Sequence, residues 1–370
     1  MDIVTTATRG AHFAAAMIGA PRNESAPLNG LKEAGAVHLG NGVYLTDSRF
    51  RIEEDGTGLS TQLTFIHGQG TDNEQAPFVV DETIGNANAR DLDKAGPDEI
   101  AFISTGVDAG NRMGMVIYAD PNEAQGDFLI TAYSRSEDGE NMREYDATIA
   151  PNAFQDIVLK NRTEANDVWV VDGVEMAGGF QGSGIYQEID GQDYLAGILV
   201  GPAQVGEDLT FVADPVGDNY QTLAKRMLLV GTADDYGTNM LVASSAGGRF
   251  RGTDLNEILK GKAGNDLLIG RGGADRLIDG AGADRLRGGE GSDVFVFVDD
   301  GEYDRALDFD LADDLIDLTD FGVTYGDLIF SDLGNGRVRI DIGDDRFLVK
   351  DGDGTPDLTS ADLTSDVFVF

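Results

Sequence analysis

A nine-residue repeat dominates the C-terminal third of the chain. Five consecutive copies start at Gly252: GTDLNEILK, GKAGNDLLI, GRGGADRLI, DGAGADRLR and GGEGSDVFV. Position six is acidic in every copy and position eight is a large apolar residue. This pattern predicts short strands joined by glycine-rich turns, each copy burying its apolar residue against the next copy. A flexible Gly/Asp linker would have no reason to keep position eight apolar.

The glycines and acidic residues of the repeat favour a hard cation. Glycine lets backbone carbonyls approach an ion, and the short Asp side chain adds a carboxylate oxygen at a fixed place. The predicted metal-site residues are Gly264, Asp266, Gly273, Asp275, Gly282, Asp284, Gly291 and Asp293. The first copy has Leu255 at position four and Glu257 at position six, so we expect it to be a cap.

The repeat resembles the G-G-x-G-x-D-x-U-x calcium-binding repeat of RTX proteins. This resemblance implies a parallel β-roll with two repeats per turn and calcium ions (Ca²⁺) between the turns. Asp266 would then share an ion with the turn carrying Asp284, and Asp275 with the turn carrying Asp293. Ion binding and folding would be one event.

The composition agrees with a cation-binding protein. The net charge is −39, which excludes nucleic acid and anionic lipid as partners. Residues 252–370 hold 25 Asp but only 3 Glu, whereas a merely salt-adapted acidic surface, the alternative, usually mixes the two. The chain has no cysteine for disulfides and no apolar run long enough for a membrane span.

Residues 299–370 are expected to form a β-rich domain, because apolar residues alternate around Asp317 and in 338–342. This part resembles the C-terminal domain of proteins exported by type I secretion systems. The resemblance implies an uncleaved export signal at Asp366–Phe370, the type I apparatus as a partner, and a secreted or surface location in a Gram-negative bacterium. An ordinary terminal strand is the alternative for the last residues.

A second candidate cation site follows the last predicted strands. Asp351, Asp353, Asp357 and Asp362 have the ligand spacing of an EF-hand loop. Pro356, however, replaces the expected glycine, and Asp362 replaces the bidentate Glu. A plain acidic turn is the alternative.

The N-terminal part reads as short strands followed by one helix. Strand-like runs occur at 42–46, 62–66, 100–103, 127–131 and 168–171, and helical periodicity appears at 220–229. Short strands with glycine-rich turns predict a β-barrel domain. The apolar run 13–20 is short for a leader, and we interpret it as mature protein.

Three motifs resemble trypsin-like serine proteases across residues 28–230. GNGVYLTDSRF (40–50) resembles the segment of the catalytic His, EIAFI (99–103) that of the Asp, and GGFQGSGIYQEIDGQDYLAGILVG (178–201) that of the Ser. Their order is that of the chymotrypsin arrangement. The resemblance implies a two-barrel domain closed by a C-terminal helix.

The triad residues are all replaced. Arg49, Glu99 and Gln181 occupy the three positions, and an arginine cannot serve as a general base. We therefore expect a pseudoprotease whose cleft binds an extracellular protein or peptide. The alternatives are an active secreted serine endopeptidase that uses Ser183 as nucleophile, or an unrelated β domain. The endopeptidase would need an unrecognised base among the three histidines, His12, His38 and His67.

Together these patterns predict an all-β chain. Its expected parts are an N-terminal extension (1–27), a degenerate two-barrel trypsin-like domain (28–230), a linker (231–251), the RTX β-roll (252–298) and a type I secretion domain (299–370).

Overall fold

The computed structural model describes residues 15–19, 33–47, 63–67, 78–80, 100–105, 112–124, 126–136, 139–158, 164–174, 181–205, 208–217, 220–352 and 358–370. Strands make up 54% of the structure and there is one α-helix among these residues, which confirms the predicted predominance of β structure. None of their helices has the length and apolar character needed to cross a bilayer. The chain divides into two compact units: unit 1 comprises 1–117 and 121–237, and unit 2 comprises 118–120 and 238–370.

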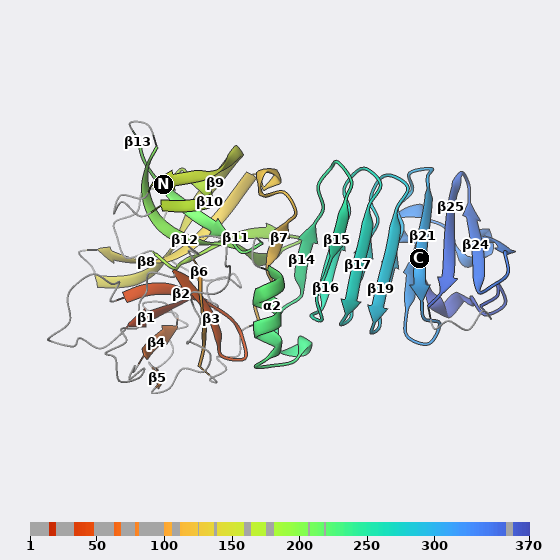
Figure 1. The fold of residues 1–370 in the computed structure, drawn as a ribbon, viewed down its shortest axis with the longest axis horizontal. Coiled ribbons are helices and arrows are strands. Elements are labelled where there is room, and N and C mark those ends of the chain that lie inside the picture. The colour runs from red at the N-terminus through yellow and green to blue at the C-terminus, as the bar shows by residue number, and fades with distance from the viewer. Residues whose placement is uncertain are drawn as a thin grey trace. The chain divides into compact units, whose positions relative to one another are not determined.

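Unit 1 contains a six-stranded antiparallel sheet with the order β5-β4-β1-β2-β3-β6 (Figure 1). Its strands are β1 (Ala15–Gly19), β2 (Glu33–Gly40), β3 (Val43–Asp47), β4 (Leu63–His67), β5 (Phe78–Val80) and β6 (Ile100–Ser104). β1 lies in the range expected to be an N-terminal extension, yet it pairs with both β2 and β4. Residues 15–19 of the apolar run 13–20 are thus part of a sheet.

The second half of unit 1 is a closed six-stranded barrel with the order β10-β13-β12-β11-β8-β9. Its strands are β8 (Gly126–Ser136), β9 (Gly139–Val158), β10 (Glu164–Asp172), β11 (Gly184–Ile189), β12 (Gln192–Val205) and β13 (Asp208–Pro215), and α2 (Tyr220–Leu228) follows. When the strands of each half are numbered from one, the first sheet has the order 5-4-1-2-3-6 and the closed barrel has the cyclic order 1-2-3-6-5-4. Every pair of neighbouring strands in the first sheet is also a pair of neighbours in the barrel. The two halves of unit 1 therefore repeat one topology.

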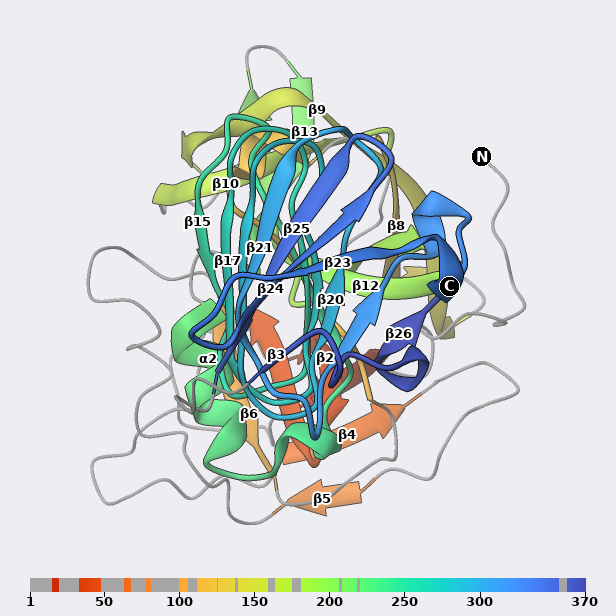
Figure 2. The same cartoon turned by 90° about the vertical axis from the view of Figure 1, so that its right-hand side faces the viewer.

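Unit 2 consists of two mainly parallel sheets between which the chain alternates. One has the order β26-β22-β20-β18-β16-β14-β7 and the other β15-β17-β19-β21-β25-β24-β23. Figure 1 shows the strands in series, and Figure 2 shows the successive turns superposed along the stack. The bounds are β7 (Val116–Tyr118), β14 (Asn239–Val242), β15 (Arg249–Arg251), β16 (Glu257–Lys260), β17 (Leu267–Gly272), β18 (Arg276–Ile278), β19 (Arg285–Glu290), β20 (Val294–Val296), β21 (Tyr303–Phe309), β22 (Leu315–Asp317), β23 (Ile329–Asp332), β24 (Arg337–Ile342), β25 (Asp345–Asp351) and β26 (Phe368–Val369).

The core of unit 2 is built from position eight of the repeats. Strand partners lie 18 residues apart, so Leu259 pairs with Leu277 and Leu277 with Phe295. In the other sheet Leu268 pairs with Leu286. All five side chains are completely buried. The predicted stacking of position eight inside a parallel roll is thus present, with two repeats per turn.

The roll is longer than the five repeats. β14 and β15 lie within the predicted linker and pair in parallel with β16 and β17. Beyond the repeats, β22 and β26 extend one sheet, and β21 and β25 extend the other. The repeat motif does not reveal these turns because they lack its glycines while keeping inward-facing apolar residues. At the end of its sheet, β24 pairs antiparallel with both β23 and β25.

Candidate calcium-binding site

Two columns of acidic residues run along the roll, one beside each sheet. The first, here called the Asp266 column, comprises Asp266, Asp284, Asp304 and Asp345. The backbone N–H of Asp266 donates to Oδ1 of Asp284 at 2.6 Å, and that of Asp284 donates to Oδ1 of Asp304 at 2.8 Å. Gly301 continues the column by donating to Oδ1 of Asp345 at 2.7 Å. Each carboxylate therefore ties its own turn to the preceding one.

The second column, here called the Asp275 column, comprises Glu257, Asp275, Asp293 and Asp314. The backbone N–H of Glu257 donates to Oδ1 of Asp275 at 2.8 Å, and that of Asp275 to Oδ1 of Asp293 at 2.9 Å. The backbone N–H of Asp293 in turn donates to Oδ1 of Asp314 at 2.9 Å. The structure thus pairs Asp266 with Asp284 and Asp275 with Asp293, which is the pairing that the RTX resemblance implies.

Several carboxylates of the roll keep one oxygen without a hydrogen-bond partner. Asp314 differs, because its Oδ2 accepts the backbone N–H of Asp310 at 2.7 Å. Six Oδ2 atoms are buried without a hydrogen bond: those of Asp266, Asp275, Asp279, Asp284, Asp293 and Asp304. A buried carboxylate oxygen without a partner is costly unless a cation or a proton satisfies it. Burial accordingly raises the pKa of Asp284 to about 6 and that of Asp304 to about 7. The folded roll therefore needs positive charge inside.

The glycines lie beside these oxygens. A Cβ added to Gly270 would collide with Oδ2 of Asp275 and with the carbonyl oxygen of Gly288, and a Cβ on Gly288 would collide with Oδ2 of Asp293. The position-four glycines adopt positive φ angles, which disfavour other residues. These angles are 102° for Gly264, 97° for Gly273, 132° for Gly282 and 130° for Gly291. Glycine is thus needed both for the turn and for space around the carboxylates.

This donor set fits calcium. Calcium takes six to eight oxygen ligands and accepts carboxylates and backbone carbonyls in irregular geometry. Among the described residues no three His, Cys, Asp or Glu side chains group closely enough to hold a metal by themselves. Backbone carbonyls of the glycine turns must therefore supply part of any ligand shell. Position-six Asp residues such as Asp275 and Asp284 would supply the carboxylate ligands.

Several acidic residues of the columns were not among the predicted ligands. Asp304, Asp314 and Asp345 continue the two columns beyond the fifth repeat. Their spacing from the preceding member is not the regular 18 residues: it is 20 for Asp304 and 21 for Asp314. A search for buried acidic residues followed by an apolar residue two positions later would have found Asp304, Asp314 and Asp345, with Ala306, Ile316 and Phe347.

Two residues of the EF-hand-like candidate, Asp351 and Asp362, lie within the described residues. Oδ2 of Asp362 accepts the backbone N–H of Thr359 at 2.9 Å and its hydroxyl at 2.7 Å, which caps a turn. Asp351 ends β25, and Asp353 and Asp357 lie outside the described residues. The calcium-loop interpretation remains a prediction.

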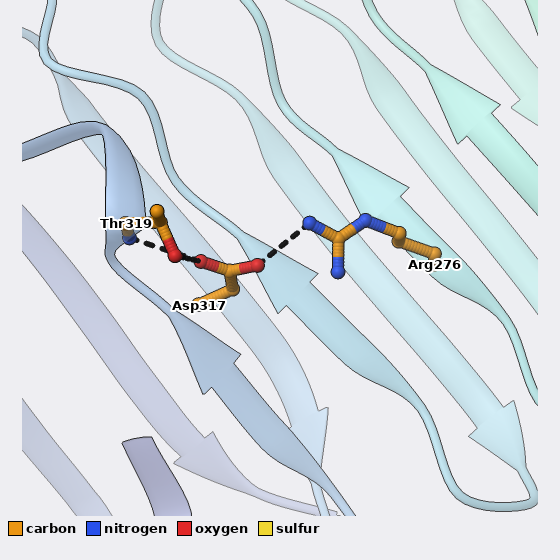
Figure 3. A network of polar contacts seen from close by, with 3 residues as sticks. All are labelled: Arg276, Asp317 and Thr319. Atoms are coloured by element: carbon orange, nitrogen blue, oxygen red, sulfur yellow. Dashed lines mark hydrogen bonds and ion pairs between the residues drawn. The ribbon is translucent and has the colours of Figure 1, made fainter. Parts of the chain in front are cut away.

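An ion pair outside the columns joins the repeats to the segment beyond them. Nη2 of Arg276 on β18 lies 2.6 Å from Oδ2 of Asp317 on β22, reaching across β20 (Figure 3). Oδ1 of Asp317 accepts the backbone N–H and the hydroxyl of Thr319. Both oxygens of this carboxylate are engaged by protein groups, unlike those of Asp275 and Asp284.

The protease-like motifs of unit 1 also come together in part. Gln181 accepts the backbone N–H of Gly35 on β2 through its carbonyl at 2.8 Å. A Cβ added to Gly182 would lie 3.1 Å from the backbone nitrogen of Asp47, and Asp47 pairs with Ile100 on β6. Arg49 and Glu99 lie outside the described residues. Asp47, two residues before Arg49, lies beside the segment that contains Gln181, and Ile100, which follows Glu99, pairs with Asp47.

Ser183 and His38 are both buried. Ser183 is 2% exposed, its Oγ lies against Gly35, and no hydrogen bond satisfies that oxygen. His38 accepts the backbone N–H of Gly42 through Nε2 at 3.2 Å and packs against the ring of Tyr44. His12 lies outside the described residues, as does the side chain of His67.

A parallel roll with carboxylates and glycine carbonyls between its turns defines a calcium-binding β-roll. Residues 251–278 and 269–297 match the family described as RTX calcium-binding nonapeptide repeat (4 copies). The chain therefore carries RTX repeats, and the ion that these repeats bind is calcium. A comparison with curated proteins gave no match.

Proposed function

We propose that this protein is exported unfolded by a type I secretion system and that calcium outside the cell folds unit 2. The supporting observation is the set of six buried Oδ2 atoms without partners. Where calcium is scarce, the negative charges of the two columns repel one another and oppose the folded roll. At the millimolar calcium found outside cells, ions can neutralise the columns and join consecutive turns.

Circular dichroism during a calcium titration tests this proposal. The full chain should gain β signal as calcium rises toward ~1 mM, the weaker end of affinities for extracellular calcium modules. Magnesium at the same concentration should be far less effective, because it demands octahedral geometry and keeps its water. The same β content in calcium and in a chelator would contradict the proposal.

For unit 1 we propose a non-catalytic binding module derived from a trypsin-like fold. Three observations support this: the strand order shared by the two halves of unit 1, the helix that follows the barrel, and the contacts of Gln181 and Gly182 with β2 and β3. With Arg49, Glu99 and Gln181 at the triad positions, the cleft would hold an extended peptide without cutting it.

The burial of Ser183 speaks against the endopeptidase alternative. A nucleophile has to reach the scissile carbonyl and needs an adjacent base, whereas this hydroxyl is packed against backbone. We expect no adduct when the calcium-folded protein is treated with a fluorophosphonate probe and mapped by peptide mass spectrometry. An adduct on Ser183 would restore the endopeptidase and redirect the search for its base to His38 and His67.

A further inference from the structure

Asp279 occupies position one of the fourth repeat, where the other repeats have glycine. The fourth repeat starts with Asp279, while the other four start with Gly252, Gly261, Gly270 and Gly288. Its side chain is not on the surface: it is 1% exposed. A buried carboxylate in place of a glycine needs a physical explanation.

In each of the four remaining repeats, the glycine at position one lies close to oxygen atoms. A Cβ on Gly252, Gly270 or Gly288 would run into the position-six carboxylate of the same repeat. A Cβ on Gly261 would run into the carbonyl oxygen of Asp279. Position one therefore lines the space between turns where the columns place their oxygens. In the fourth repeat a carboxylate occupies this position.

The Asp279 carboxylate is held between two turns. Its Oδ1 accepts the backbone N–H of Gly280 in its own turn at 2.7 Å and that of Val298 in the next turn at 3.1 Å. Its Oδ2 is buried without a partner, as are Oδ2 of Asp284 and Oδ2 of Asp304. The carboxylate of Asp304 joins the same two turns, because its Oδ1 accepts the backbone N–H of Asp284 at 2.8 Å.

We propose that Asp279 is a side-chain ligand, together with Asp304, of a calcium ion bound between the turn that ends at Asp284 and the turn that ends at Asp304. Backbone carbonyls complete the shell. This inference rests on calcium binding by the roll. Asp279 adds a carboxylate at position one, where the other repeats have only glycine, and calcium affinity rises with the number of charged ligands. This site therefore binds more tightly than the sites formed by position six alone.

Calcium binding by the full chain, measured by isothermal titration calorimetry at pH 7.5, tests the assignment. D279G restores the residue of the other repeats, and D279N keeps the shape of the side chain while removing its charge. Each should weaken the tightest binding event by ~10-fold or more, or remove one ion, because one charged ligand is lost. D344N removes an equally negative but exposed carboxylate and should leave all binding events unchanged.

The outcomes separate this inference from the proposed function. Unchanged number and affinity of ions in D279N and D279G, with weakened binding in D275N, would overturn the role of Asp279 and leave calcium-driven folding intact. Absence of calcium binding in the unaltered chain would overturn both. Circular dichroism at saturating calcium checks that each variant folds, and D279N alone decides the matter if D279G does not.

Discussion

The backbone N–H of Asp275 donates to Oδ1 of Asp293, 18 residues later, while Oδ2 of each residue is buried without a hydrogen bond. One oxygen of each carboxylate thus fixes the distance between turns, and the other is left for a ligand. The arrangement recurs in the Asp266 column at Asp266 and Asp284. The same residues therefore define the register of the roll and its demand for a cation.

Replacing Asp275 by Asn should weaken calcium-dependent folding. The substitution removes one carboxylate ligand and keeps the side-chain volume, so the calcium concentration at the folding midpoint should rise ~10-fold or more. The midpoint is read from circular dichroism at 218 nm. D344N, which changes an exposed carboxylate, serves as the control and should fold at the midpoint of the unaltered chain. Equal midpoints for both variants would contradict a ligand role for Asp275.

Acid should partly substitute for calcium. The folded-state pKa of Asp304 is raised to about 7 and that of Asp314 to about 7, chiefly by burial, from a usual value of 3.8. A group with a raised pKa stabilises the fold fully below its unfolded pKa, and this contribution is lost as pH rises through the folded pKa. In a chelator, the β signal should therefore be larger at pH 4.5 than at pH 8. A calcium-free chain that loses structure on acidification over this range would contradict this account.

Shortening one of the stacked position-eight side chains should destabilise the calcium-loaded roll. Leu277 is completely buried between Leu259 and Phe295, so Leu277→Ala should cost about 2–5 kcal/mol of unfolding free energy. Urea denaturation at saturating calcium measures the loss. Ile329→Ala is the matched control, because Ile329 is 64% exposed, and it should change the free energy by less than about 0.5 kcal/mol. Similar losses in both variants would argue against the stacked core.

The Arg276–Asp317 pair should stabilise the junction between the repeats and the last turns (Figure 3). Burial acts to raise the pKa of Asp317, but hydrogen bonds from Thr319 and Arg276 outweigh it and lower the pKa. Because the pKa is lowered, this stabilisation is present above the unfolded pKa and is lost as pH falls through the folded pKa. Arg276→Met should cost ~1 kcal/mol at pH 7 in calcium, within the range for partly exposed pairs, and less at pH 3. A cost that does not depend on pH would assign Arg276 a packing role instead.

The sequence predicts the repeating part of the roll well because its signals are local and periodic. Position six and position eight recur every nine residues, so the burial of Leu277 follows from the pattern. The pairing of Asp266 with Asp284 follows from the RTX resemblance, which implies two repeats per turn. In unit 1, the runs at 42–46, 100–103 and 168–171 lie within β3, β6 and β10 or overlap them closely. Alternating apolar residues and flanking glycines carry that information.

The rest of the roll could not be predicted because its turns depart from the repeat. Asp304 and Asp314 are reached through longer turns, so a fixed spacing misses them. β14 and β15 have neither the glycines nor the acidic residue of the motif, and only pairing with β16 and β17 reveals them. The proposed ligand role of Asp279 also rests on the burial of its side chain, which the repeat pattern does not reveal.

Hydrogen–deuterium exchange with mass spectrometry tests calcium-driven folding of unit 2 most directly. It reports on the backbone amides of Asp266, Asp275 and Asp284, which the columns hold in the folded roll. With 1 mM calcium, peptides covering residues 257–300 should be strongly protected, and in a chelator they should exchange at the rate of an unfolded chain. Peptides from β11 and β12 in unit 1 should exchange alike in both conditions. Equal protection of residues 257–300 with and without calcium would contradict the account.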